Sequence, residues 1–215
     1  MAGKVKSKMK NLKITGLIVS AGKSGRMGNF KPLMDYKGKT FLQRIVISLN
    51  TVSEKIIIVS GFKSELLQKE TIKIFSNKSE KFLNDKIQFV ENENYEKGMF
   101  TSLQEGLSVI ENCDWVLYHF VDQPGLPPEF YIDFVGQIDN IHNWVQPSYD
   151  NRNGHPVLFN AEVIDLILNS DKNSNLRELS KNSIVKKKSW ECYYKNILQD
   201  IDTQEDYFES INPVD

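Results

Sequence analysis

The sequence predicts a single α/β domain of three layers, with helices on both faces of a mostly parallel sheet. Apolar runs of strand length alternate with helical patterns along the chain, which is typical of this fold class. The runs lack the polar alternation of a half-exposed strand, so we expect central strands that are covered on both faces. At 215 residues with 40% apolar composition, the chain can bury one sizeable core, and nothing indicates two independent domains.

Each element is expected from its local pattern. Strands are expected at 14–20, 56–60, 87–90, 115–121, 144–149, 156–159 and 193–198. A helix with its apolar face at Leu42, Ile45, Val46 and Leu49 follows a capping box of Thr40 and Gln43, and a second box, Ser102 with Glu105, opens a helix bearing Leu103, Leu107 and Ile110. The lysine-rich stretches 69–86 and 181–188 are expected to be solvated helix or loop.

Charge and hydropathy exclude several classes of function. The 27 basic and 28 acidic residues nearly cancel, so no global field favours nucleic acid or an anionic membrane, and any anion site must be local. No run is long enough to span a bilayer, and residues 1–12 form a flexible basic arm without the apolar centre of a signal peptide. These features predict a cytoplasmic protein. Cys113 and Cys192 are isolated and are expected to be reduced thiols.

The stretch at 17–31, LIVSAGKSGRMGNFK, has the pattern of a phosphate-binding loop. Three glycines stand at three-residue intervals directly after an expected strand, and glycine lets consecutive backbone N–H groups approach one anion closely. The loop also carries cations that a polyphosphate needs. The residues concerned are Gly22, Gly25 and Gly28, with Lys23, Arg26 and Lys31.

Two common phosphate loops do not fit this spacing. A Walker A sequence needs a glycine five residues before its Gly-Lys pair, where this chain has Leu17. The dinucleotide fingerprint G-x-G-x-x-G needs one residue between its first two glycines, and here there are two. On spacing alone, a plain glycine-rich turn with incidental cations remains the alternative.

Asp122-Gln123-Pro124 ends the apolar run before it. Ligands of an open parallel sheet collect beyond the carboxyl ends of its strands, so Asp122 and the glycine loop are expected to face one crevice. Carboxylate oxygens are the ligands that Mg²⁺ prefers, and the metal would in turn bridge phosphate oxygens. The structural alternative is a carboxylate that only caps the end of a strand.

Three more polar segments have plausible structural roles. Ser102, within NENYEKGMFTSLQEGL at 92–107, would suit a helix cap as well as it would suit contact with a base or ribose. His155 is by default a packed, hydrogen-bonded histidine, and His119 and His142 are expected to be the same. Thr203 with Asp206 is expected to be a helix N-cap.

Together these motifs resemble the MobA-like nucleotidyltransferase family. The family's first loop has the form L-x-A-A/G-G-x-S-x-R-M-G with a lysine two or three residues on, and this chain has SAGKSGRMG at 20–28 and then Lys31. Ala21 and the later motifs make it most similar to the molybdenum cofactor cytidylyltransferase branch. The resemblance covers 13–207 and implies a Rossmann-like nucleotidyltransferase domain over 13–211, with an NTP- and metal-binding half at 13–125 and an acceptor-binding half at 126–211.

The resemblance also implies roles for individual residues. Nucleotide contacts would come from Ser20, Ala21, Gly22, Lys23, Ser24, Gly25, Arg26, Lys31, Gly61 and Ser102. Asp122 would hold Mg²⁺ or Mn²⁺ with Asp202 as the second carboxylate, although Asp200 is left open as the second ligand. Lys31, Arg26 and Asp122 would carry the catalysis.

On the acceptor side, the motif Gly-His-Pro-Val-Leu implies that Gly154 and His155 contact the pterin. Some positions depart from the family pattern. Asn153 stands where many relatives have arginine or glycine, and Gln204 replaces the usual proline. The segment before Arg177 lacks the second glycine of the family motif, which leaves the contact of this arginine open.

The implied reaction is the transfer of CMP from CTP to molybdopterin or the molybdenum cofactor, with release of pyrophosphate and a molybdenum hydroxylase apoenzyme as a further partner. GTP-dependent guanylyltransferases and sugar- or polyol-phosphate nucleotidyltransferases share the scaffold and remain alternatives. A non-catalytic nucleotide-binding chaperone of a molybdenum hydroxylase is an alternative of another class. The presence of Lys31, Asp122 and Asp202 argues against it.

Overall fold

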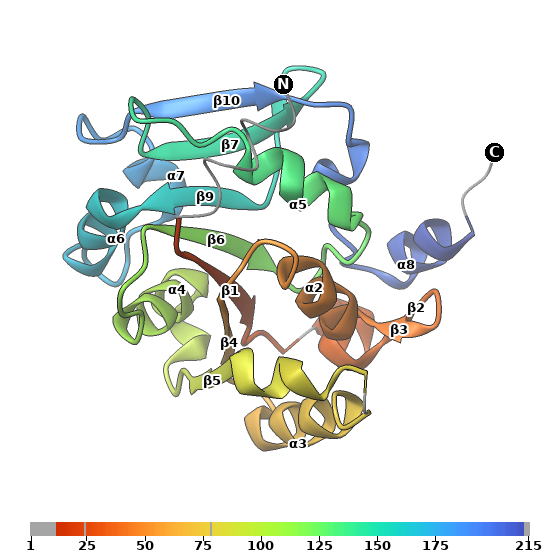
Figure 1. Ribbon diagram of the computed structural model, residues 1–215. Coiled ribbons are helices and arrows are strands. Elements are labelled where there is room, and N and C mark those ends of the chain that lie inside the picture. The colour runs from red at the N-terminus through yellow and green to blue at the C-terminus, as the bar shows by residue number, and fades with distance from the viewer. Residues whose placement is uncertain (1–11, 24, 78, 213–215) are drawn as a thin grey trace.

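The computed structural model describes residues 12–23, 25–77 and 79–212. Nearly all of the predicted arm at 1–12, and Ser24 of the glycine loop, lie outside the described residues. An eight-stranded sheet forms the centre (Figure 1), in the order β10-β7-β9-β6-β1-β4-β5 with β8 paired to β7. The strands are β1 (Ile14–Ser20), β4 (Lys55–Ser60), β5 (Ile87–Glu91), β6 (Trp115–Phe120), β7 (Trp144–Tyr149), β8 (Arg152–Asn153), β9 (Val157–Asn160) and β10 (Lys187–Glu191).

The predicted mostly parallel sheet is confirmed. β1 pairs in parallel with both β4 and β6, and β5 extends this parallel part beyond β4. β9 runs antiparallel to β6 and β7, while β10 is parallel to β7. The carboxyl ends of β1, β4, β5 and β6 therefore share one edge of the sheet.

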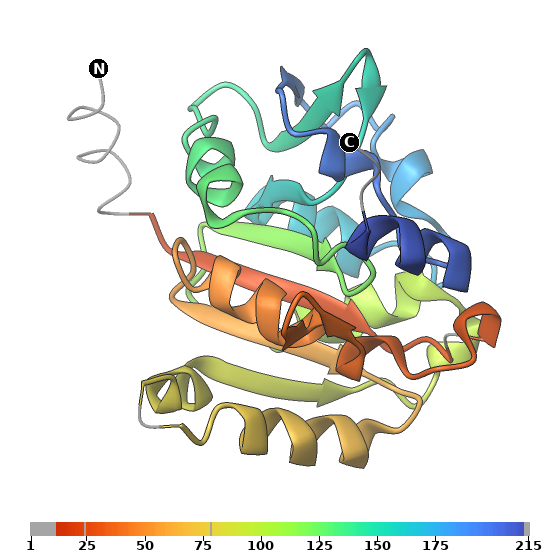
Figure 2. The same cartoon turned by 90° about the vertical axis from the view of Figure 1, so that its right-hand side faces the viewer.

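Helices cover both faces of the sheet and complete three layers (Figures 1 and 2). One face packs on α2 (Phe41–Leu49), α3 (Ser64–Ile74) and α5 (Pro128–Val135), and the other on α4 (Met99–Ser108) and α6 (Ala161–Leu168). The smaller elements are the hairpin β2 (Asp35–Tyr36) and β3 (Lys39–Thr40), the helices α7 (Leu176–Leu179) and α8 (Gln204–Ile211), and 3-10 turns at Gly25–Met27, Lys31–Leu33, Lys81–Lys86, Tyr95–Lys97 and Lys195–Leu198.

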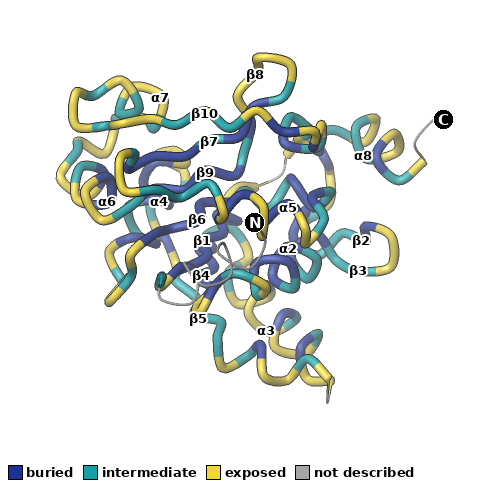
Figure 3. Tube along the Cα trace, turned by 45° about the horizontal axis from the view of Figure 1, so that its top comes forward, coloured by how far each residue is buried: buried dark blue, intermediate teal, exposed yellow. Residues whose placement is uncertain are grey.

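The core lies on both sides of the central strands, which Figure 3 shows as buried. In β4, Ile58 packs with the α2 and α3 side, while its neighbour Ile57 packs with the α4 side. Because successive side chains of a strand point to opposite faces, both faces must be apolar, and the strand appears in the sequence as one continuous apolar run. Burying each such side chain stabilises the fold by roughly 1.5–3 kcal/mol.

Two of the predicted caps are confirmed and one is wrong. Thr40 caps its helix by accepting the backbone N–H of Gln43 at 3.1 Å, but the predicted box is not reciprocal because the Gln43 side chain bonds Glu80 instead. Thr203 forms a reciprocal capping box with Asp206. Ser102 does not cap a helix. Helix α4 begins three residues earlier, after Gly98 at φ 113°, so Ser102 lies inside it.

Of two predictions for the last part of the sheet, one was wrong and the other was wrong only at its end. Residues 193–198 were expected to be a strand but include a 3-10 turn at Lys195–Leu198, and buried Tyr194 directly precedes this turn while buried Ile197 lies within it. The lysine-rich 181–188 was expected to be helix or loop, which is confirmed for 181–186, but Lys187 and Lys188 begin the edge strand β10. No residue of this strand is fully buried, and its one aromatic residue, the half-buried Trp190, stacks on Phe134 with ring centroids 5.7 Å apart.

Residues without a predicted role behave as ordinary structural groups. His119 is buried, its Nε2 lies 2.8 Å from the hydroxyl of Tyr131, and burial lowers its pKa to about 4. Cys113 and Cys192 are free thiols. Within the described residues, no helix combines the length and the apolar character needed to cross a membrane.

Candidate active site

The predicted loop and carboxylate motifs meet at the carboxyl edge of the sheet. The parallel register pairs Val19 with Phe120, so the glycine loop and Asp122 leave neighbouring strands side by side. A cavity of about 360 Å³ lies between them. It brings together the predicted residues Ser20, Ala21, Gly22, Gly25, Arg26, Lys31, Ser102, Asp122 and Asp202.

A buried lysine lies between the two carboxylates of this cavity. Lys31 is 7% exposed, and its Nζ lies 2.5 Å from Asp202 Oδ1 and 3.8 Å from Asp122 Oδ2. Arg26 Nη2 lies 2.7 Å from the other oxygen of Asp202. The hydrogen bond from Lys31, aided by the charges of Lys31 and Arg26, holds the pKa of Asp202 below its usual value. Asp202 is therefore ionised at neutral pH.

Asp122 is in a different environment. Burial raises its pKa to about 6, the nearby charge of Lys31 opposes this rise, and the charges of Asp200 and Asp202 add to it. Its Oδ1 is buried and has no hydrogen-bond partner among the described residues. A desolvated carboxylate with an unsatisfied oxygen beside a second carboxylate is a set of donors that fits a divalent cation.

The same geometry bears on the choice of second carboxylate. Asp200 Oδ1 accepts a hydrogen bond from Gln123 Nε2 at 2.8 Å, whereas Asp202 lines the cavity. Among the described residues there is no cluster of three or more His, Cys, Asp or Glu side chains able to hold a metal by themselves. Mg²⁺ is commonly held by one or two carboxylates together with substrate phosphates, and this pair provides that arrangement.

The glycine loop leaves open space beside its backbone. A Cβ built on Gly22 or Gly25 would meet nothing within 4 Å, and Gly28 has a φ of +67° that favours glycine. The hydroxyl of Ser20 is buried without a hydrogen-bond partner in the described part of the chain. Open space, backbone amides and an unsatisfied hydroxyl suit an anion that approaches the loop closely.

Two predicted nucleotide contacts lie outside the described lining of this cavity. Lys23 is exposed and forms an ion pair with Glu96 at the surface. At Gly61, an added Cβ would lie 2.6 Å from the ring of Tyr95, so glycine is needed there for packing. Because Tyr95 lines the cavity, Gly61 affects the cavity indirectly, by allowing the ring of Tyr95 to pack against the backbone. Direct nucleotide contact by Lys23 or Gly61 stays a prediction.

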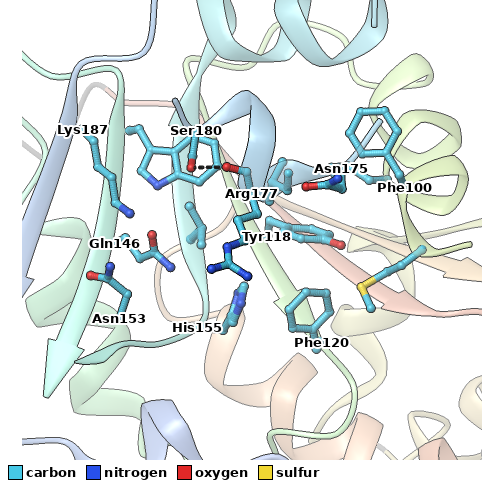
Figure 4. A pocket seen from close by; sticks show the side chains of 15 residues that line it. Phe100, Tyr118, Phe120, Gln146, Asn153, His155, Asn175, Arg177, Ser180 and Lys187 are labelled. Carbon is cyan, nitrogen blue, oxygen red and sulfur yellow. Dashed lines mark hydrogen bonds between the residues drawn. The ribbon is translucent and has the colours of Figure 1, made fainter. Parts of the chain in front are cut away.

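A second cavity of about 580 Å³ adjoins the first (Figure 4). Met99 and Phe120 line both cavities. The lining of the second cavity combines aromatic rings with polar and cationic side chains, and Figure 4 shows Arg177 beside His155 and Asn175 beside Phe100. The aromatic residues are Phe100, Tyr118, Phe120, Trp144 and His155, and the polar ones include Gln146, Asn153, Asn175, Arg177 and Lys187. This is a shape and composition suited to a flat polar heterocycle.

His155 lies in the second cavity as an uncharged ring. Burial, with the charge of Lys187, lowers its pKa to about 4. Its ring packs edge-on against Phe120 with centroids 4.5 Å apart, and its buried Nδ1 has no hydrogen-bond partner among the described residues. The imidazole can thus offer a hydrogen bond to a ligand without carrying charge.

Gly154, the other predicted acceptor contact, has a packing role. A Cβ there would lie 2.4 Å from the backbone oxygen of Ile197, and its N–H donates to Pro147 at 2.9 Å. Contact with the acceptor stays a prediction for Gly154, whereas its requirement for glycine follows from the fold.

Substitutions of Gly22 and Gly154 by alanine are expected to have opposite effects, one on nucleotide binding and the other on stability. Gly22→Ala is expected to leave the melting temperature unchanged and to weaken nucleotide binding about tenfold, because the added methyl enters open space beside the loop backbone. Gly154→Ala is expected to lower the melting temperature by several degrees, because backbone must shift. Thermal unfolding and calorimetric titration with nucleotide would measure both. A destabilised Gly22→Ala variant with normal nucleotide affinity contradicts the prediction.

Sequence reasoning gave no role to several residues that line or support the cavity beside the glycine loop, among them Asn92, Tyr95, Met99 and Phe120. Asn92 directly follows β5 and Phe120 ends β6, whereas Tyr95 and Met99 lie in the segment that leads from β5 into α4. The strand-end position of Asn92 and Phe120 was the available signal, because all parallel strand ends meet at one edge of the sheet.

Comparison with known proteins agrees with this geometry. The model of the MobA-like NTP transferase domain matches residues 16–188. The chain belongs to the MobA-like NTP transferase family. This family assignment makes it a nucleotidyltransferase, consistent with a glycine loop after the first strand and with the carboxylates of Asp122 and Asp202 in the cavity beside it.

Individual relatives of this MobA-like protein are distant but span most of the chain. A molybdenum cofactor cytidylyltransferase of Escherichia coli K12 is 23% identical, covering 89% of this chain and 92% of its own. A probable molybdenum cofactor guanylyltransferase of Bacillus cereus AH820 is 24% identical, covering 93% and 92%. The structure of Rv0371C from Mycobacterium tuberculosis H37Rv in complex with manganese has a TM-score of 0.66 at 18% identity, covering 94% of this chain and 100% of its own.

Proposed function

We propose that this enzyme transfers CMP from CTP to molybdopterin or the molybdenum cofactor and releases pyrophosphate. The observation that carries the proposal is the position of Lys31 between Asp122 and Asp202, at the end of a glycine loop and beside a second, aromatic cavity. The similarity to a molybdenum cofactor cytidylyltransferase supports the choice of nucleotide and acceptor. A molybdenum hydroxylase apoenzyme would receive the product.

The chemistry is a direct displacement. A terminal phosphate oxygen of the acceptor forms a bond to the α-phosphorus of CTP, and the bond from that phosphorus to the bridging oxygen breaks as pyrophosphate leaves. The attacking oxygen is ionised at neutral pH, so no base and no covalent enzyme intermediate are needed. Positioning and neutralisation of charge carry the catalysis.

The residues divide this work by position. The loop amides and Arg26 would bind the β- and γ-phosphates, and Lys31 would neutralise the α-phosphate by exchanging part of its contact with Asp202. Asp122 and Asp202 would hold Mg²⁺ or Mn²⁺. When bound, the metal supplies further positive charge to the phosphates. The unsatisfied Oδ1 of Asp122 and the manganese complex of a protein with the same fold support the metal assignment.

The proposal is tested by incubating the purified protein with each NTP in turn, Mg²⁺ and molybdopterin, and following pyrophosphate. We expect release that requires both CTP and the pterin. Pyrophosphate release with a sugar phosphate or polyol phosphate, and none with the pterin, would show that the acceptor substrate is not a pterin. Nucleotide binding without release under any combination would favour a non-catalytic role.

A second candidate is the guanylyl transfer reaction. The similarity to probable guanylyltransferases is the observation that favours it, at nearly the same identity as the cytidylyltransferase. The cavity would then have to admit a purine.

Base choice distinguishes the two candidates. We expect CTP to be preferred to GTP by at least about tenfold in kcat/KM, or about 1.4 kcal/mol, because the methyl group of buried Ala21 narrows the cavity where guanylyltransferases usually have glycine. Ala21→Gly is expected to gain activity with GTP. Side-by-side kinetics with both nucleotides measure this, and a wild-type preference for GTP would replace the cytidylyl assignment by the guanylyl one.

A further inference from the structure

A buried asparagine beside the nucleotide cavity has a fixed orientation. Asn92 directly follows β5 and is 0% exposed. Its Oδ1 accepts the backbone N–H of Asn94 at 2.9 Å. A backbone N–H can only donate, so the side-chain atom facing it must be the oxygen. The amide NH₂ of Asn92 is thereby directed to the other side, towards α4.

The NH₂ group donates to two adjacent hydroxyls, Thr101 Oγ1 and Ser102 Oγ, each at 2.9 Å. Each hydroxyl therefore accepts from Asn92 and keeps its own proton to donate elsewhere. Thr101 donates to the carbonyl of Gly98 at 2.8 Å. For the proton of Ser102, the described residues provide no acceptor within hydrogen-bond distance, and Ser102 is the hydroxyl of the two that lines the cavity.

We infer that Asn92 sets base specificity by making Ser102 an obligatory hydrogen-bond donor to an acceptor nitrogen of the base. Cytosine offers such an atom at N3, which carries no hydrogen. Uracil N3 carries hydrogen and would oppose the hydroxyl proton of Ser102 with a second donor. A buried donor left unpaired discriminates strongly between ligands.

Asn92 is a positioning residue in this inference because it acts through Ser102. The identity of the preferred nucleotide rests on the proposed function, whereas the direction of the hydrogen bond rests on the contacts of Asn92 alone. CTP and UTP provide the cleanest comparison, since they share the ribose, the triphosphate and the size of the ring.

Asn92→Asp tests the inference with a side chain of the same shape. One carboxylate oxygen can still accept from Asn94, but the other can only accept, so Ser102 would donate to it and turn a lone pair towards the base. We expect the wild type to bind CTP at least about tenfold more tightly than UTP, and the variant to lose or invert this preference. Calorimetric titration at pH 8, where the introduced carboxylate is ionised, would measure both affinities.

Tripolyphosphate, which has no base, serves as the reference ligand. Its affinity is expected to stay within about twofold in the variant, because the effect is confined to the base. Thr101→Val is the matched control protein. It removes the other acceptor of the Asn92 amide and leaves Ser102 in place, so the preference for CTP should persist.

An Asn92→Asp protein that folds and keeps the wild-type CTP preference would overturn the inference, as would a wild type that binds CTP and UTP equally. If the buried carboxylate prevents folding, Ser102→Ala decides, since alanine is well tolerated within a helix. Loss of the CTP preference supports the inference, and its retention overturns it. Nucleotide binding is measured without the acceptor substrate. The test of this inference therefore does not depend on whether the proposed CMP transfer takes place.

Discussion

Asp122→Asn is expected to lower kcat for nucleotidyl transfer at least about 1,000-fold, or about 4 kcal/mol, while the protein remains folded. The substitution keeps the shape of the side chain and removes the charge that a divalent cation needs from Asp122. Rates of pyrophosphate release under saturating substrates would measure the loss. Activity within about threefold of wild type, less than about 1 kcal/mol, would remove Asp122 from the site.

Asp200→Asn is the matched control for this variant. Asp200 is also partly buried, and it contributes to the raised pKa of Asp122, but its Oδ1 is bonded to Gln123 and an asparagine oxygen can keep that bond. We expect only a modest loss of kcat. A loss as large as that of Asp122→Asn would instead make Asp200 the second metal ligand in place of Asp202.

The Asp122→Asn variant should also change the pH dependence of stability. The raised pKa of Asp122, about 6, means that the folded protein holds this proton more tightly than the unfolded chain. The ionised carboxylate therefore opposes folding above about pH 6, and this cost vanishes below about pH 4, where the group is neutral in both states. Without divalent cations, Asp122→Asn should melt at or above the wild-type temperature at pH 7, with the difference shrinking as the pH is lowered to 4.

Lys31→Ala is expected to lower kcat about 100-fold and to raise the KM for nucleotide by less than about fivefold. The reason is that negative charge grows on the α-phosphate during attack, so a cation at this position stabilises the transition state more than the bound substrate. Steady-state kinetics separate the two effects. A pure KM effect would make Lys31 a ground-state binding residue.

Lys23→Ala provides the comparison for this measurement. Lys23 belongs to the same loop, but it is exposed and paired with Glu96, outside the described lining of the cavity. Its kcat should stay within about threefold of wild type. Equal losses in the two variants would show that the loop needs net positive charge rather than an ammonium group at Lys31.

The central fold was predictable because its strands are buried on both faces. Such strands appear as short apolar runs, and the run that became β1 was predicted to its last residue. The edge strand β10 was not recognised, since an edge strand can expose charged side chains to solvent and needs few apolar residues. The 3-10 turn at Lys195–Leu198 was mistaken for a strand because a short apolar segment does not distinguish a strand from a helical turn by its pattern alone.

The candidate site was partly predictable for a similar reason. The glycine loop and Asp122 follow strands, so the topology of a parallel sheet brings them together. The pairing of Lys31 with Asp202 could not be derived, because it depends on how the segment before α8 returns to the loop. The role of Asn92 was also hidden, since hydrogen-bond direction depends on side-chain orientation that a residue pattern does not contain.

The ion pair of Lys31 and Asp202 joins positions that are 171 residues apart, and Gln204 adds a hydrogen bond to the carbonyl of Met27 in the glycine loop. During synthesis, the amino-terminal half emerges from the ribosome long before Asp202 does. A growing chain thus presents Asp122 and the glycine loop with one carboxylate absent. Under the proposed function, a product terminated before residue 202 lacks one of the two carboxylates proposed to hold the metal, so we expect it to show no transfer activity rather than partial activity.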